Sequence, residues 1–353
     1  MKSISYDIDP GGDVELILKK QNKQNIVPES PTFHGNPVDP EFPNPPCLGR
    51  YQVFSELYPD GENENPDVEV RMRVSSRHLI FASRTFRAML EGPWKEGNSS
   101  SRPIRQISAE NWDAFALAIV LDSIHGRHHE IPTQITDGLL TRIATIVDYY
   151  ECRQAMHFNY EVWAHGKTLP SKLCNAALLW LHVSWVFHDE NRFRIAARLF
   201  VRFSIGAYDF ETHDLPVSGV LDLLDGIRRT LINTVSEALD SLEQHMIDED
   251  GCDYFKDPDC TAIVLGILVR ERHTITNLDP PLVAPFDGYS LHKILRRISR
   301  FRTPMSPHND LDQPYEKDDD EEEHPCTIQG RLMPVLKEIE KVIDGVRLAA
   351  LQS

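Results

Sequence analysis

The stretch Val68–Leu90, VEVRMRVSSRHLIFASRTFRAML, decides the fold class of this chain. Its first seven residues alternate strictly between apolar and charged side chains, which predicts a strand with one buried face. At Ser75-Ser76 the apolar period changes from two to about three and a half, the period of a helix. Ser83 interrupts the helical run and is a candidate N-cap for a second helix. A strand that leads into two short helices is typical of a scaffold rather than of a catalytic centre.

The helical part of this stretch predicts its own core. Apolar side chains recur on one face at Leu79, Ala82, Phe86, Met89 and Leu90. Because a short amphipathic helix is stable only when its apolar face is covered, we expect Leu79, Phe86 and Met89 to be buried.

Further blocks follow in a specific order, namely Trp94-Lys95-Glu96, Ile124-His125-Gly126-Arg127, Ile131-Pro132 and Ile146-Val147-Asp148-x-Tyr150-Glu151-Cys152. Together with Val74–Leu90 they resemble a BTB/POZ domain in the divergent form common in fungal proteins. The chain departs from the animal pattern, in which a His-Lys pair usually stands where Ser75-Ser76 stand here. The resemblance implies an α+β fold, with a BTB/POZ-like three-layered small β-sheet and helical cluster, followed here by an all-α C-terminal region.

The N-terminal part predicts a hairpin with a long interruption. Residues 13–19 form a short apolar strand, which we expect to pair with residues 68–74. Residues 21–66 are rich in proline and predict an irregular insertion. A small ordered island is expected within it at Val53, Phe54, Leu57 and Tyr58. The predicted organisation is a first strand in 1–20, the insertion 21–66, a BTB/POZ-like core 67–165, a helical domain 170–302, an acidic disordered linker 303–330 and a C-terminal amphipathic helix 331–353.

Residues 103–107 predict a third strand, and Ser108 is the expected N-cap of the next helix. The apolar face of that helix is expected to contain Trp112, Phe115, Ala116, Ile119 and Val120.

The C-terminal segment carries two contrasting patterns. Residues 318–323 are six consecutive acidic residues, which predict a solvated segment that is dispensable for folding. Residues 331–350 predict one amphipathic helix with the apolar stripe Leu332, Val335, Leu336, Ile339, Val342, Ile343 and Val346. This stripe either folds back onto the helical half, which we favour, or docks into a groove on a second chain. In the second case Leu336, Ile339 and Ile343 are the candidate interaction residues.

Composition limits the function classes. A length of 353 residues suits about two domains, and a formal charge of −17 disfavours nucleic-acid binding. The basic segment Arg296-Arg297-x-x-Arg300-x-Arg302 is interpreted as a solvated helix face. No apolar run approaches the roughly 20 residues of a membrane span. The six cysteines, without zinc-ribbon spacing, are interpreted as reduced thiols of an intracellular protein, with cytoplasm and nucleus both open.

No sequence motif predicts a cofactor or a metal site. His125, His128 and His129 are interpreted as exposed loop histidines. The pattern Asp248-x-Asp250-Gly251-x-Asp253 departs from a calcium loop, because the glycine comes too early and the final glutamate is missing. Phosphate-loop, dinucleotide and Gly-x-Ser-x-Gly patterns are absent from the sequence.

The BTB/POZ resemblance implies a non-catalytic protein–protein interaction module or adaptor, often a homodimer, which in many members docks a substrate onto a cullin-type ubiquitin ligase. Cullin-binding members usually carry an apolar residue, any residue and then Glu. Here the segment is Ser108-Ala109-Glu110, so Ser replaces the apolar residue. Trp94, Glu110 and Trp112 are the candidate contact residues in this part of the chain. The alternative function is an enzyme of unknown class with its site in the helical C-terminal half.

Overall fold

The computed structural model describes residues 2–23, 25–26, 49–57, 68–92, 104–207, 210–252, 258–278, 280–302 and 326–352. The fold is α+β. The chain divides into unit 1, which holds residues 1–196 and 210–218, and unit 2, which holds residues 197–209 and 219–351. Trp94, the acidic run 318–323 and most of the insertion 21–66 lie outside the described residues.

Unit 1 contains a mixed four-stranded sheet in the order β1-β3-β2-β4. Its strands are β1 (Lys2–Asp7), β2 (Val14–Lys19), β3 (Val68–Val74) and β4 (Arg105–Glu110). β2 pairs antiparallel with β3, with Val14 opposite Val74 and Leu18 opposite Val70. This register confirms the predicted hairpin, and the apolar side chains of β3 alternate inward as expected.

β1 was not predicted. It runs parallel to β3 and places Ile4 opposite Val70. Only two of its side chains, Ile4 and Tyr6, supply an apolar face, so its periodicity is too short to identify a strand. β4 runs parallel to β2 on the other side.

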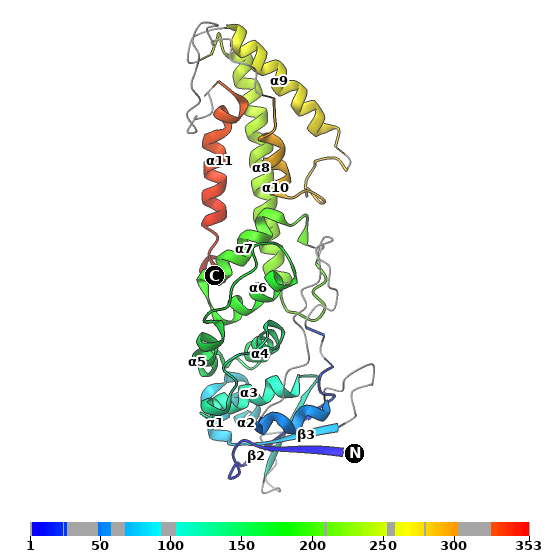
Figure 1. Ribbon diagram of the computed structural model, residues 1–353, viewed down its shortest axis with the longest axis vertical. Helices are drawn as coiled ribbons and strands as arrows, with labels where there is room; N and C mark the ends of the chain where they lie inside the picture. The colour runs from blue at the N-terminus through cyan, green and yellow to red at the C-terminus, as the bar shows by residue number, and fades with distance from the viewer. Residues whose placement is uncertain are drawn as a thin grey trace. The chain divides into compact units, whose positions relative to one another are not determined.

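The helices of unit 1 cover the sheet in successive layers. They are α1 (Ser76–Ala82), α2 (Arg84–Glu91), α3 (Ala114–Ile124), α4 (Asp137–Tyr149), α5 (Arg153–Ala164) and α6 (Asn175–Phe187). Figure 1 shows α3 between the sheet and α4, and every residue of α3 is buried. This helix was predicted to have a single apolar face. It is instead buried on all sides, because it has the sheet on one side and α4 on the other.

Two helix starts test the predicted caps. Ser83 accepts a hydrogen bond from the Phe86 N–H at 2.9 Å, which confirms it as the N-cap of α2. The cap predicted at Ser108 is wrong, because the β2–β4 ladder continues to Glu110 and keeps Ser108 in the strand. Asp113 caps α3 instead and accepts from the Ala116 N–H at 2.7 Å.

The ordered island in the insertion is η1 (Gly49–Leu57), a 3₁₀ segment with Tyr51, Phe54 and Leu57 buried. Phe54 and Leu57 agree with the prediction, whereas Val53 is exposed and Tyr58 lies outside the described residues. The hydroxyl of Tyr51 donates to the buried carboxylate of Asp122 at 2.9 Å. This bond ties the insertion to α3.

The boundary between the two units lies later in the chain than residue 170, where the helical domain was predicted to start. The reason is that α6 packs on α4 inside unit 1. α7 (Glu190–Phe203) begins in unit 1 and ends in unit 2. Unit 2 also contains α8 (Ser218–Asp248), α9 (Pro258–Thr276), α10 (Leu291–Ile298), α11 (Ile328–Asp344) and α12 (Leu348–Leu351).

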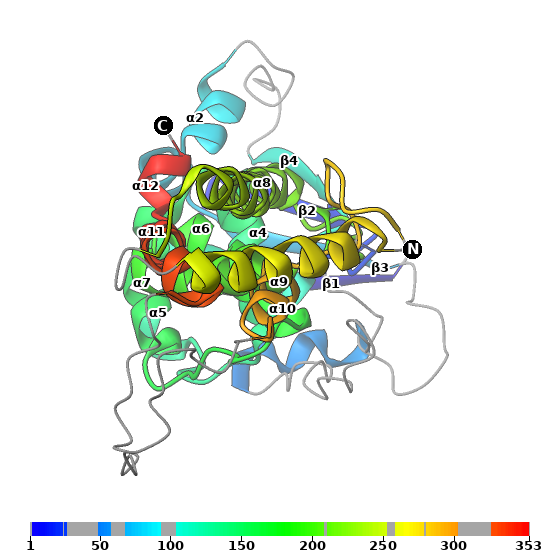
Figure 2. The ribbon, with the colours of Figure 1, turned by 90° about the horizontal axis from the view of Figure 1, so that it is seen from above.

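α10 lies close to the end of α9 (Figure 2), where the Arg297 guanidinium donates to the Thr274 carbonyl at 3.4 Å. Across the part of the chain that the structure describes, no helix is both long and apolar enough to cross a membrane.

The C-terminal helix is shorter than predicted. α11 ends at Asp344, where the N–H of the C-cap residue Gly345 donates to the Lys341 carbonyl at 2.8 Å, and α12 follows as a separate turn. Leu332, Ile339 and Ile343 are buried within unit 2, whereas Val342 is 42% exposed. The stripe therefore folds back onto the chain's own helices, as the favoured alternative expects.

Candidate functional site

Two of the predicted contact residues, Glu110 and Trp112, lie at one cavity of about 720 Å³ in unit 1. Asn111, between them, has a left-handed φ of 72° and turns the chain out of β4 toward α3. Its N–H donates to the Lys19 carbonyl at 3.1 Å, which holds the turn against β2. The cavity is also lined by Met89, Tyr149, Tyr150 and Asp214.

One wall of this cavity is aromatic. The Trp112 ring lies edge-on to Tyr149, with 5.3 Å between centroids, and 6.2 Å from Tyr150. Tyr150 stacks in turn on the buried Phe86 at 4.2 Å. Burial raises the pKa of the Tyr150 hydroxyl above its usual range. Tyr149 is 60% exposed. Its ring therefore faces solvent while it contacts the buried rings of Trp112 and Tyr150.

The rim of the cavity is charged. The Glu110 carboxylate pairs with the Lys20 ammonium at 3.1 Å, and Asp214 accepts from the Asn25 N–H at 3.2 Å. Ser108 and Glu110 both point outward from β4, because alternate side chains of a strand share a face. An aromatic wall with a charged rim suits the binding of an apolar side chain of a ligand in which the flanking groups are polar.

The candidates on the C-terminal helix are placed differently. Ile339 and Ile343 are 2% and 0% exposed, so they belong to the core of unit 2 and are closed to a partner. This corrects the expectation of three interaction residues on one stripe. Leu336 is half-buried and lines a groove of about 830 Å³ with residues of α7, α10 and α11.

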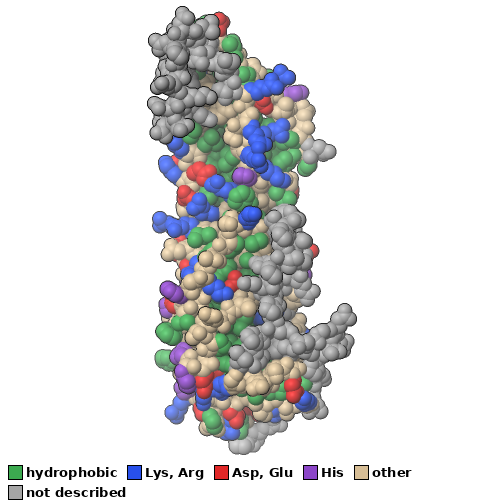
Figure 3. Space-filling view, viewed as in Figure 1, with side chains coloured by type: hydrophobic (Ala, Val, Ile, Leu, Met, Phe, Trp, Pro, Cys, Tyr) green, Lys and Arg blue, Asp and Glu red, His purple; other side chains and the backbone are tan. Residues whose placement is uncertain are grey.

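The basic segment 296–302 is in unit 2, and the histidine group 125–129 is in unit 1. Lys and Arg side chains gather over α9 and α10 in Figure 3, and Arg296 and Arg300 are exposed there. His125 was predicted to be an exposed loop histidine, but it is half-buried at the end of α3. Its Nε2 accepts from the Ser75 N–H at 3.0 Å, and burial lowers its pKa.

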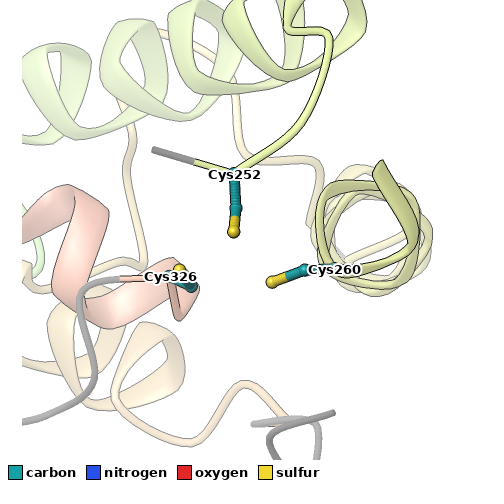
Figure 4. Close-up of side chains that lie close together, drawn as sticks. All are labelled: Cys252, Cys260 and Cys326. Carbon is teal, nitrogen blue, oxygen red and sulfur yellow. The ribbon is translucent and has the colours of Figure 1, made fainter. Parts of the chain in front are cut away.

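Unit 2 contains a group that sequence reasoning missed. Cys252, Cys260 and Cys326 are buried, and their sulfur atoms all lie within 4.8 Å of one another. The sulfurs point toward one another from three segments (Figure 4). Burial and the neighbouring Cys326 and Cys252 raise the pKa of Cys260 to about 12. The spacing of the three cysteines along the chain is too long for a short-range metal-binding motif.

Comparisons with protein-family models, with curated proteins and with solved structures give no match for this chain.

Proposed function

We propose that this chain is a protein–protein interaction adaptor built on a BTB/POZ-like unit 1, with the cavity at Trp112 as its contact site. The residues quoted from Val74 to Cys152 support the resemblance. The order β2, β3, α1, α2, β4, α3 supports it further, since it follows the order of strands and helices that the sequence predicts. The additional β1 lies beside β3 and leaves this order unchanged.

The observation that carries the proposal is the exposed ring of Tyr149 above the Trp112 wall. Interface hot spots are enriched in tyrosine and tryptophan, because these rings bury a large area at a small cost in conformational entropy. Tyr149 is preorganised by its contacts with Trp112 and Tyr150, whose centroids lie at 5.3 and 4.9 Å. A partner therefore gains apolar contact without having to order this side chain.

The chemistry of the site favours a protein segment as the ligand. An apolar side chain would fill the cavity beside Met89 and Trp112, and a lysine or arginine would lie opposite Glu110 and Asp214. Ser108 and Glu110 share the exposed face of β4 next to the cavity. A cullin-type ligase subunit and a second copy of the chain are the two partner classes that the resemblance implies.

Quantitative affinity purification with mass spectrometry tests the proposal. The chain with Tyr149→Ala should lose at least one specific partner, whereas Phe158→Ala should retain it. Phe158 is the matched control, because it is 64% exposed in the same unit but lies on α5, away from the lining of the cavity.

Both variants should melt at the temperature of the unchanged chain, because neither removes a buried side chain. Sedimentation of the purified protein distinguishes self-association from capture of another protein. An identical partner set for the unchanged chain and Tyr149→Ala, with no change in oligomeric state, would reject the Trp112 cavity as the contact site.

A further inference from the structure

The cysteine cluster of unit 2 brings together three segments of the chain. Cys252 follows α8, Cys260 lies in the first turn of α9, and Cys326 precedes Thr327, the N-cap of α11. Their exposed fractions are 0%, 3% and 6%, and they form a cluster of their own, separate from the core of unit 1. Three thiols that meet in a buried position form a ligand set for a soft cation.

We propose that Cys252, Cys260 and Cys326 bind a zinc ion through their three sulfur atoms. Zinc in proteins is held by thiolates with Zn–S of about 2.3 Å in tetrahedral geometry, which places two sulfurs about 3.8 Å apart. The three sulfurs of this cluster already lie within 4.8 Å of one another. Only a small inward movement of the side chains is needed.

Two of the three thiols lie at the N-terminal ends of helices, although burial opposes their deprotonation until a cation is bound. Cys260 is at the N-terminal end of α9, where the helix dipole stabilises negative charge. Cys326 lies at the N-terminal end of α11, so a second helix points its positive end toward the cluster. Each thiol gives up its proton to solvent when the Zn–S bond forms, and the resulting group carries a net charge of −1.

A half-buried cation lies close to this negative charge. Arg331 is near enough for its charge to act on Cys326, and its guanidinium pairs with Glu249 at 3.1 Å. The Nε–H of Arg331 is buried without a hydrogen-bond partner among the described residues. Groups around a metal commonly orient its ligands, and this donor is available to do so.

The three ligands leave one position of the tetrahedron to a solvent molecule. Cys252 and Cys260 are eight residues apart, and Cys326 follows 66 residues later. Because the ligands come together only in the folded state, the free energy of metal binding at such a site adds to the stability of the fold. The zinc would therefore connect the start of α11 to the end of α8 and the start of α9.

Metal analysis of the full-length chain tests this assignment. The protein is purified in a reducing buffer, stripped with a chelator, and titrated with Zn²⁺ alone. We expect one zinc per chain, retained after gel filtration. Substitution by Co²⁺ should produce thiolate-to-cobalt charge-transfer absorption.

Serine at Cys252, Cys260 or Cys326 should weaken zinc binding at least tenfold, whereas Cys174→Ser should bind zinc as the unchanged chain does. Cys174 is a suitable control because it is half-buried in unit 1 and outside the cluster.

A second measurement uses the unchanged chain alone, in case a serine variant does not fold. Zinc should raise the melting temperature of the stripped protein, and the chelator should lower it again. No retained zinc together with an unchanged melting temperature would overturn the proposal. A disulfide between two of the three cysteines, detected by peptide mapping without reduction, would overturn it too. Retention of copper(I) in preference to zinc under the same conditions would show that the metal is wrongly assigned.

Discussion

Phe86 is the buried side chain that holds α2 against the core of unit 1. It is fully buried and stacks on Tyr150 at 4.2 Å. Phe86→Ala should lower the free energy of unfolding by about 3–5 kcal/mol, the cost of deleting a buried phenylalanine. Phe81→Ala is the control on the neighbouring helix, because Phe81 is 90% exposed. Denaturant unfolding should place the second variant within about 0.5 kcal/mol of the unchanged chain. Equal effects of the two substitutions would contradict the assigned burial.

His182 should make the stability of unit 1 depend on pH. It is 1% exposed in α6 and lies 3.1 Å from the Thr145 hydroxyl, and burial lowers its pKa to about 4. An unfolded histidine titrates near pH 6.5, so between these values the unfolded chain binds a proton that the folded chain excludes. Stability should therefore fall as the pH decreases from about 6.5 to about 4, by roughly 3 kcal/mol at 1.4 kcal/mol per pKa unit.

Urea unfolding across this pH range measures the effect. His182→Gln should flatten the curve by that amount, whereas substitution of the exposed His165 by Gln should leave it unchanged. A pH dependence that is the same with and without His182 would mean that another group controls acid unfolding.

At the scale of a single element, α11 has a buried and an exposed side. Ile339 is 2% exposed and Val342, one turn later, is 42% exposed. Ile339→Asp places a charge among apolar side chains and should cost about 3 kcal/mol or more, seen as a lower melting temperature of the monomer. Val342→Asp should melt close to the unchanged chain. If instead Ile339→Asp changed only self-association, the burial of α11 within unit 2 would be the wrong account.

At the scale of the whole molecule, the sheet should hold the chain together after it is cut. β2 pairs with β3 on one side and with β4 on the other. A protease site introduced after Pro37 would separate residues 1–37 from the rest covalently. The two pieces should still elute together in native buffer and separate only in denaturant, because β1 and β2 carry the ladder bonds. Release of the short piece under native conditions would contradict the strand order.

Local sequence patterns were sufficient to predict several strands and helices of unit 1. The alternation in residues 68–74 predicts β3 and its buried face, and the change of period at Ser75-Ser76 predicts α1 and α2. The hairpin with β2 follows from two apolar strands that need neighbours. These features are predictable because periodicity, capping and strand pairing act over a few residues or between two strong patterns.

Other features depend on residues far apart in the chain. Tyr6, Tyr51 and Asp122 form one buried hydrogen-bonded group, which gives β1 and η1 their places. The cavity at Trp112 depends on Tyr149 from a later helix, and the three cysteines come from three separate segments. No local period connects such positions. The sequence by itself determined β2, β3, α1 and α2. Only the tertiary structure decided where β1 lies and which distant side chains meet, because burial removes solvent from groups that distant elements bring together.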